Sequence, residues 1–246
     1  GTGYELSRVL AERLLSHPNA KANLTIHYEH KVEALIEEGD RILGVRGIDE
    51  KSGQPFEIMA QATVIAAGGI GGNIPLVKKH WFKPWGEPPE TILNGAHKYG
   101  QGDLHDQVVR VNGNITHLDK MWPYAAGIHH PEPKREDHGL SLVPPKSALW
   151  LNFKGERIGP MPLMTAYDTR YLVEEICKQE KKYSWQVLNL KIAYKEFAIS
   201  GSEHNKAMKE KNLLGFLKTI LFGNKALVNE MLENCQDFVV ADTIEE

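Results

Sequence analysis

The spacing of apolar positions near the N-terminus changes once, and the change separates a helix from a group of strands. Over residues 4–16, apolar side chains recur every three or four positions, which predicts an amphipathic helix. Beyond it, short apolar runs separated by turns at Gly39 and Gly53 predict strands over 24–28, 31–37, 41–48 and 55–60. Residues 62–67 are apolar almost throughout, as in a strand that is buried on both faces.

The rest of the chain mixes predicted helices and strands with irregular segments. Residues 75–89 are rich in Trp, Pro and Lys and are predicted to be a surface connection, and residues 121–145 are rich in His, Pro and Gly and are predicted to be irregular. The remaining pattern predicts helices over 102–112, 169–179, 205–222 and 225–234, and strands over 148–152 and 184–190. The chain starts without Met, and residues 242–246 have the composition of a helix N-terminus, so we expect a central fragment of a longer protein.

Composition and charge exclude several classes of protein. With 246 residues, 41 % of them hydrophobic and 25 % charged, the chain has the composition of a soluble globular protein. Its net charge of −3 gives no bulk attraction to nucleic acid. No apolar run approaches the roughly 18 residues of a membrane span, and no signal peptide opens the chain. The widely separated Cys177 and Cys235 favour buried thiols over a disulfide, so we expect a cytoplasmic protein.

A run of glycines follows the predicted strand over 62–67 directly. Glycine has no Cβ and tolerates positive φ, so such a run lets backbone approach a ligand closely. The run is not the Gly-rich dinucleotide fingerprint, because Ile74 stands where its last glycine should be. Two interpretations are open: a turn that passes a bound ligand, or a plain connection from a strand to a helix.

Residues 66–73, Ala-Ala-Gly-Gly-Ile-Gly-Gly-Asn, resemble the A-T/A-G-G-x-G-G-N segment of flavoproteins related to fumarate reductase and 3-ketosteroid dehydrogenase. In that family the segment lies beside the FAD and leads into a cap domain that covers the substrate. The resemblance implies FAD as the cofactor. The cofactor-binding residues that it implies are Val32, Ala66, Ala67, Gly68, Gly69, Gly71 and Gly72. The family's N-terminal dinucleotide fingerprint is absent from this chain.

Residues 95–103 resemble the family segment in which a histidine precedes T-G-D-G by a few positions. The resemblance places His97 at a substrate carbonyl or carboxylate. A histidine there can donate a hydrogen bond to an oxygen whose negative charge grows during hydride transfer. The alternative is that His97, one of eleven histidines, is an ordinary loop residue. Leu104 departs from the family, where glycine is usual.

The acid or base of the reaction has three candidates. Tyr124 lies in an aromatic and proline-rich run, where it is either a proton donor or part of a pocket wall. The strand and turn over 150–157 resemble the family, but the arginine that serves as proton donor in fumarate reductases has only Arg170 as a counterpart. Tyr167 is the alternative, since steroid dehydrogenases use tyrosines. Arg170 is otherwise an exposed residue paired with a nearby carboxylate.

The histidine pair at 129–130 does not indicate a metal site, because no third ligand stands at a suitable spacing. The predicted fold is α+β / α/β: a partial FAD-binding domain of the glutathione-reductase-like type over 1–95, and an inserted α+β cap domain over 96–246 that is truncated at its C-terminal end.

The resemblance implies an FAD-dependent oxidoreductase acting on CH–CH groups, with a small-molecule substrate. Hydride would pass between FAD and a carbon next to a carbonyl-activated C–C or C=C bond, in a ketosteroid-like or fumarate-like molecule. The isolated chain is expected to be inactive. The alternatives are a catalytically inert, separately folding fragment and a non-redox binding module of the same fold. The electron-transfer partner, the reaction direction and the oligomeric state stay open.

Overall fold

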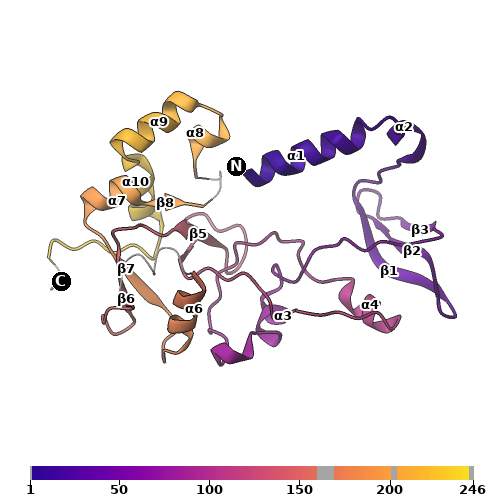
Figure 1. The fold of residues 1–246 in the computed structure, drawn as a ribbon, viewed down its shortest axis with the longest axis horizontal. Coiled ribbons are helices and arrows are strands. Elements are labelled where there is room, and N and C mark those ends of the chain that lie inside the picture. Colours follow the sequence, from indigo (N-terminus) through magenta and orange to yellow (C-terminus); the bar gives the residue numbers. More distant parts are fainter. Residues whose placement is uncertain (1, 160–168, 201–203, 244–246) are drawn as a thin grey trace. The chain divides into compact units, whose positions relative to one another are not determined.

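The structure is a computed structural model that describes residues 2–159, 169–200 and 204–243 (Figure 1). Within these residues the chain forms two compact units. The first unit comprises residues 1–73 and 97–118, and the second comprises residues 74–96 and 119–246. Each unit is built from two separate stretches of sequence, so the chain passes between the units three times.

An antiparallel three-stranded meander forms the centre of the first unit (Figure 1). Strand β1 pairs with β2 and β2 with β3, and Gly39, with a φ of +57°, allows the tight turn between the first two strands. Leu35, which is 3 % exposed, is the buried anchor of β1. The elements of this unit are α1 (Thr2–Leu15), α2 (Ala20–Asn23), β1 (His30–Glu38), β2 (Arg41–Asp49), β3 (Pro55–Met59) and α4 (His105–Arg110).

Two of the strands predicted for this unit are wrong. Residues 24–28 and residues 62–67 have no strand structure. In the second segment Val64 is 90 % exposed and Ile65 is 39 % exposed, so the apolar run is not buried in the described part of the chain. A strand needs a neighbour to satisfy its backbone groups, and the sheet of this unit ends with β3.

The second unit combines a small antiparallel sheet, a hairpin and several helices (Figure 1). The sheet has the order β4-β5-β8, and β6 pairs with β7 in the hairpin. The elements of this unit are α3 (Ile74–Lys79), η1 (Lys83–Trp85), β4 (Gly127–His129), β5 (Gly139–Val143), β6 (Leu149–Asn152), α6 (Thr169–Cys177), β7 (Ser184–Val187), α7 (Leu190–Glu196), β8 (Ala198–Ile199), α8 (Lys206–Lys209), α9 (Leu213–Phe222) and α10 (Lys225–Asn234).

The main hydrophobic core lies in the second unit. Leu172 of α6 and Met231 of α10 are completely buried, and Trp150 of β6 is 2 % exposed. Cys177 and Cys235 are buried free thiols, and burial raises the pKa of both. A raised pKa keeps each thiol protonated and unreactive at neutral pH. No helix in the described ranges is both long and apolar enough to cross a membrane.

Three sequence predictions for the second unit need correction. Residues 121–145 are not wholly irregular, because they contain β4 and β5. The strand predicted over 184–190 ends at Val187, because the side chain of Asn189 caps α7 by accepting a hydrogen bond from Ile192 N (2.9 Å). The helix predicted over 205–222 is two helices, α8 and α9. The helix expected after residue 242 falls largely on residues outside the described ranges.

Candidate functional site

The glycine run and the His97 segment, singled out separately in the sequence, lie against each other in the first unit. The amide of Gly72 donates a hydrogen bond to the carbonyl oxygen of Gly100 (2.8 Å). The side chain of Gln101 donates to the carbonyl oxygen of Gly72 (3.1 Å). The side chain of Asn73 donates in turn to the carbonyl oxygen of Gln101 (3.4 Å). These bonds join residues 72–73 and 97–101 into one structure, called the paired loops below.

Glycine is required at two positions of the run for different reasons. A Cβ on Gly72 would lie 2.6 Å from the carbonyl oxygen of His97 and 3.0 Å from that of Gly100, closer than van der Waals contact allows. Gly68 has a φ of +79°, which other residues rarely adopt. Gly68, at the start of the run, therefore provides a left-handed backbone conformation. Gly72, at its end, allows the backbone of residues 97–100 to approach closely.

The start of the glycine run and the residues just before it are exposed. Residues 64–69 are exposed, whereas Ile70 is 4 % exposed and anchors the run in the unit. Gly69 has open space where a Cβ would be. This strip can therefore serve as a wall against which a flat ligand lies. Val32 is half-buried on β1 opposite Gly47, and its contact with a cofactor stays a prediction.

His97 is exposed on the paired loops with its ring 5.2 Å from that of Tyr99. Its Nδ1 accepts a hydrogen bond from the amide of Tyr99 (3.3 Å). A neutral imidazole that accepts at Nδ1 carries its proton on Nε2. The local geometry thus favours the tautomer in which Nε2 is a donor, which is the form that can stabilise a developing oxyanion.

The other predicted catalytic residues belong to the second unit or lie outside the described residues. Tyr124 is 52 % exposed, with its ring 6.4 Å from that of Trp122. Arg170 is exposed at the start of α6, with its guanidinium 5.6 Å from the centre of the Phe82 ring. Tyr167 lies outside the described residues. His97 belongs to the first unit, and its catalytic partnership with these groups stays a prediction.

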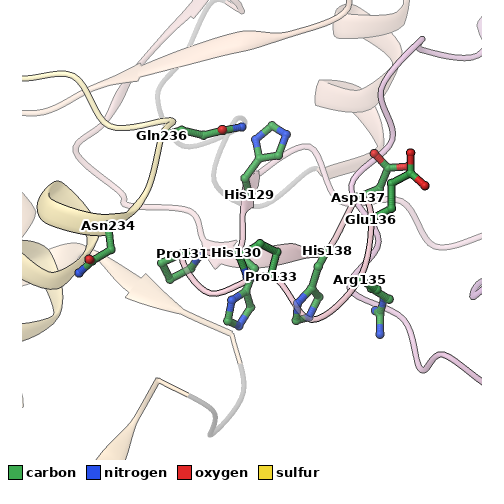
Figure 2. A pocket seen from close by; sticks show the side chains of 10 residues that line it. All are labelled: His129, His130, Pro131, Pro133, Arg135, Glu136, Asp137, His138, Asn234 and Gln236. Atoms are coloured by element: carbon green, nitrogen blue, oxygen red, sulfur yellow. The ribbon is translucent and has the colours of Figure 1, made fainter.

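A pocket in the second unit was not predicted from the sequence. Its volume is about 320 Å³, and the loop between β4 and β5 supplies most of its lining (Figure 2). His130, His138 and Arg135 extend to one side of this loop, whereas Glu136 and Asp137 extend to the other. The guanidinium of Arg135 donates to the carbonyl oxygens of Asn94 (2.9 Å) and Ala96 (2.7 Å). These bonds fix the loop between β4 and β5 to residues 94–96.

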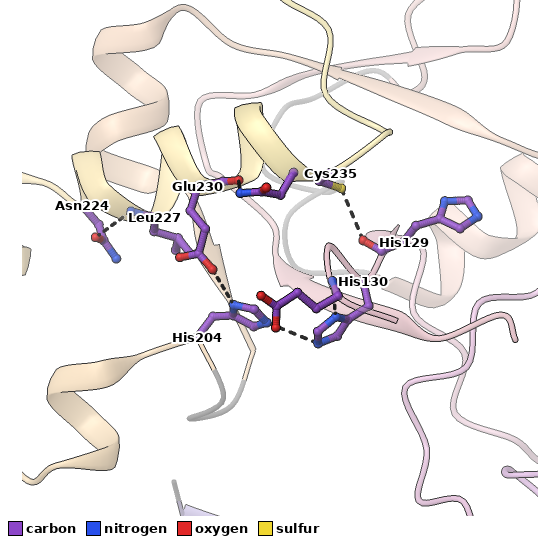
Figure 3. A network of polar contacts seen from close by, with 9 residues as sticks. His129, His130, His204, Asn224, Leu227, Glu230 and Cys235 are labelled. Carbon is purple, nitrogen blue, oxygen red and sulfur yellow. Dashed lines mark hydrogen bonds and ion pairs between the residues drawn. The ribbon is translucent and has the colours of Figure 1, made fainter. Parts of the chain in front are cut away.

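Three histidines lie close together at this pocket, and Figure 3 shows two of them, His130 and His204. His130 is 5 % exposed and stacks on His138 with the ring centres 4.2 Å apart. Its Nε2 lies 3.4 Å from Nε2 of His204, whose Nδ1 is 3.5 Å from a carboxylate oxygen of Glu230. The neighbouring His129 contacts a different carboxylate: its Nδ1 lies 2.8 Å from a carboxylate oxygen of Asp237. Among the described residues, no three His, Cys, Asp or Glu side chains are placed so that they could hold a metal ion together. The histidine-rich sequence over 129–138 was the only available signal for this cluster, and it did not indicate His204.

The comparisons with known proteins point to one family. The model of the FAD binding domain family matches residues 1–242. A KsdD-like steroid dehydrogenase of Mycolicibacterium smegmatis is 33 % identical over 257 residues, covering 99 % of this chain and 46 % of that protein. A KsdD-like steroid dehydrogenase of Mycobacterium tuberculosis is 34 % identical over 260 residues, covering 100 % of this chain and 45 % of that protein. A urocanate reductase of Eggerthella lenta is 24 % identical over 103 residues, covering 42 % of this chain and 16 % of that protein.

Proposed function

Because the chain belongs to the FAD-binding domain family of oxidoreductases, we propose that it transfers hydride between FAD and a carbon next to a carbonyl-activated C–C or C=C bond. The observation that carries this proposal is the exposed backbone strip over 64–69, which continues into the paired loops that hold His97. The chain spans less than half the length of the steroid dehydrogenases it matches, so the proposed activity is that of the intact protein.

The described residues fit one wall of an FAD site. FAD, when bound, supplies the hydride donor or acceptor. The exposed backbone of Ala66, Ala67, Gly68 and Gly69 is proposed to lie against it, and Gly71 and Gly72 to hold that strip to the paired loops. The absence of a side chain along the glycines supports this role, since any Cβ there would keep a flat ring system at a distance.

His97 is proposed to bind and polarise the substrate carbonyl. Its Nε2–H would donate a hydrogen bond to the carbonyl oxygen and stabilise the negative charge that develops there as hydride moves. Tyr124, Tyr167 and Arg170 are the proposed proton donors or acceptors. They belong to residues 96–246, which we propose to be a truncated cap domain, with residues 1–95 as part of the FAD-binding domain.

A 3-ketosteroid is the proposed substrate class. The relatives that cover nearly the whole chain are named as steroid dehydrogenases, whereas the urocanate reductase covers less than half of it. The exposed rings of Trp122, which is 80 % exposed, and Tyr124 provide apolar surface of the kind that a steroid would contact. We propose that the intact protein works in the cytoplasm.

The substrate class is tested by assaying the intact protein in both directions. Steroid oxidation is followed by reduction of an electron-accepting dye in the presence of a 3-ketosteroid. The reverse chemistry is followed by oxidation of a reduced dye in the presence of fumarate or urocanate. We expect dye reduction that depends on the ketosteroid. Turnover of fumarate or urocanate without any steroid oxidation would contradict the steroid assignment and keep the flavoprotein assignment.

The second candidate function is a non-redox binding module, or an inert fragment of the same fold. The observation that favours it is the absence of the Gly-rich dinucleotide fingerprint from the 246 residues, since that motif supplies the phosphate site for FAD. The oxidoreductase and the binding module differ in whether the intact protein binds flavin, whereas an inert fragment is compatible with an intact protein that does.

A further inference from the structure

The residues directly before His97 are bound to the loop between β4 and β5. The amide of Asn94 donates to the carbonyl oxygen of Asp137 (2.6 Å), and the amide of Gly139 donates to the carbonyl oxygen of Asn94 (3.2 Å). These two bonds make a short parallel bridge between Asn94 and His138. The bridging residues all belong to the second unit, so the bridge is part of the fold of that unit.

The segment from Leu93 to Ala96 is tightly held. Asn94 is 5 % exposed, and its side-chain oxygen accepts a hydrogen bond from the amide of Ala96 (2.9 Å). A Cβ on Gly139 would lie 2.5 Å from the Cβ of Leu93, so the two segments are in close contact. A buried polar side chain that is hydrogen-bonded in this way specifies one local conformation. The backbone therefore has a defined course up to the residue before His97.

Arg135 makes the last of these contacts before His97. One terminal nitrogen of its guanidinium, Nη2, donates both to the carbonyl oxygen of Asn94 (2.9 Å) and to that of Ala96 (2.7 Å). A guanidinium is planar and always charged, and hydrogen bonds from a charged donor are about twice as strong as those between neutral groups. Among the contacts of this segment, the bond to Ala96 is the one that reaches the chain next to His97.

The carbonyl of Ala96 belongs to the same peptide group as the amide nitrogen and Cα of His97. Because a peptide group is planar, a bond that holds this oxygen also restricts the orientation from which His97 extends. On the other side of His97, its own carbonyl oxygen accepts a hydrogen bond from the amide of Gly100 (3.0 Å). Both peptide groups that flank His97 are thus held, and its ring accepts the bond from the amide of Tyr99.

We propose that Arg135 is a positioning residue for His97. By holding the peptide group between Ala96 and His97, it directs Nε2–H of the imidazole toward the substrate carbonyl. This role rests on the proposed function, in which His97 is the oxyanion donor. A hydrogen bond to a developing oxyanion depends on distance and direction, so a small displacement of the donor lowers the rate strongly. Arg135 acts through His97 and needs no contact with the substrate.

A double-mutant cycle in the intact protein tests this role. Arg135→Met removes every donor of the side chain and is expected to lower kcat with a 3-ketosteroid about tenfold or more. In a His97→Ala background the same substitution should lower kcat less than about twofold, because no imidazole is left to position. Arg135→Lys keeps a charged donor and should restore part of the loss. Flavin content and circular dichroism should match those of the unmodified protein. If Arg135→Met does not fold, Arg135→Lys carries the same cycle.

Glu136→Gln is the matched control. Glu136 is an exposed residue of the same loop, and its side chain extends away from that of Arg135 (Figure 2). We expect unchanged turnover for this variant, which shows that a change of charge in the loop is not enough to slow the reaction.

Three results would overturn the role of Arg135. One is an equal loss of kcat from Arg135→Met with and without the His97 imidazole, since the arginine would then serve the fold alone. Another is unchanged kcat of Arg135→Met beside a slow His97→Ala variant. The third is loss of flavin or of folded structure in both Arg135 variants. Unchanged turnover of His97→Ala would instead overturn the proposed role of His97 and that of Arg135 with it, so the two failures are distinguishable.

Discussion

Replacing Gly72 by valine is expected to abolish flavin binding by the intact protein. A Cβ at this position would lie 2.6 Å from the carbonyl oxygen of His97, which is backbone and cannot rotate away. The paired loops must then separate, and the exposed strip over 64–69 loses its support. The measurement is the flavin absorbance per protein after desalting, for Gly72→Val and for the unmodified protein.

Gly3→Val is the matched control for this substitution. Gly3 lies on α1 and has nothing within 4 Å of the position where a Cβ would be. Both variants add the same side chain, so only Gly72→Val tests the close approach of the two loops. Full retention of flavin by a folded Gly72→Val variant would contradict the proposed role of the paired loops in the cofactor site.

Replacing His97 by alanine is expected to lower kcat with a 3-ketosteroid by about 10²–10³-fold, the loss typical of removing one oxyanion donor. Flavin content should not change, because the bond between His97 and Gly100 uses the backbone, and the ring accepts its bond from the amide of Tyr99 within the same loop, away from Gly72. The measurement is steady-state turnover with a dye acceptor, together with the flavin spectrum of the same preparation. This comparison separates a loss of catalysis from a loss of cofactor.

His117→Ala is the control for the histidine substitution. His117 is also an exposed histidine of the first unit, and its Nδ1 lies 2.8 Å from the hydroxyl of the neighbouring Thr116. We expect unchanged turnover for this variant. Unchanged turnover of His97→Ala would remove the oxyanion-stabilising assignment and leave His97 as an ordinary loop residue.

Local patterns were sufficient to predict much of the fold. The meander was predicted to within one residue at most strand ends, because alternation along each strand and the turn at Gly39 act over short distances. Helix α10 was predicted with its bounds for the same reason, since it has an N-cap and an apolar face within ten residues. The helix predicted over 205–222 failed at Lys211, where apolar periodicity does not reveal a left-handed residue.

The strand predicted over 62–67 shows the limit of such patterns. An apolar run such as Val64-Ile65 indicates that a segment tends to be buried, but it does not specify which strand would pair with it. Strand formation depends on donors and acceptors from elsewhere in the fold, and no described strand supplies them to this segment. The β5 strand was missed for the converse reason: its partners include β8, which lies about sixty residues further along the chain.

In the candidate site, too, local motifs were predictable from the sequence, whereas contacts between distant segments were not. The glycine run and His97 were identified from their sequence motifs. Their meeting through Gly72 and Gly100 joins positions far apart in the chain, and no spacing rule predicts it. The cluster of His130 and His204, 74 positions apart, was missed for that reason.

The central claim is that the intact protein is a flavoprotein, and its visible spectrum tests this most directly. The purified protein is desalted and scanned for flavin absorbance before and after addition of FAD. We predict a yellow protein, or one that becomes yellow and retains a stoichiometric flavin spectrum after a second desalting. A protein that stays colourless with excess FAD would contradict the oxidoreductase assignment and favour the non-redox binding module.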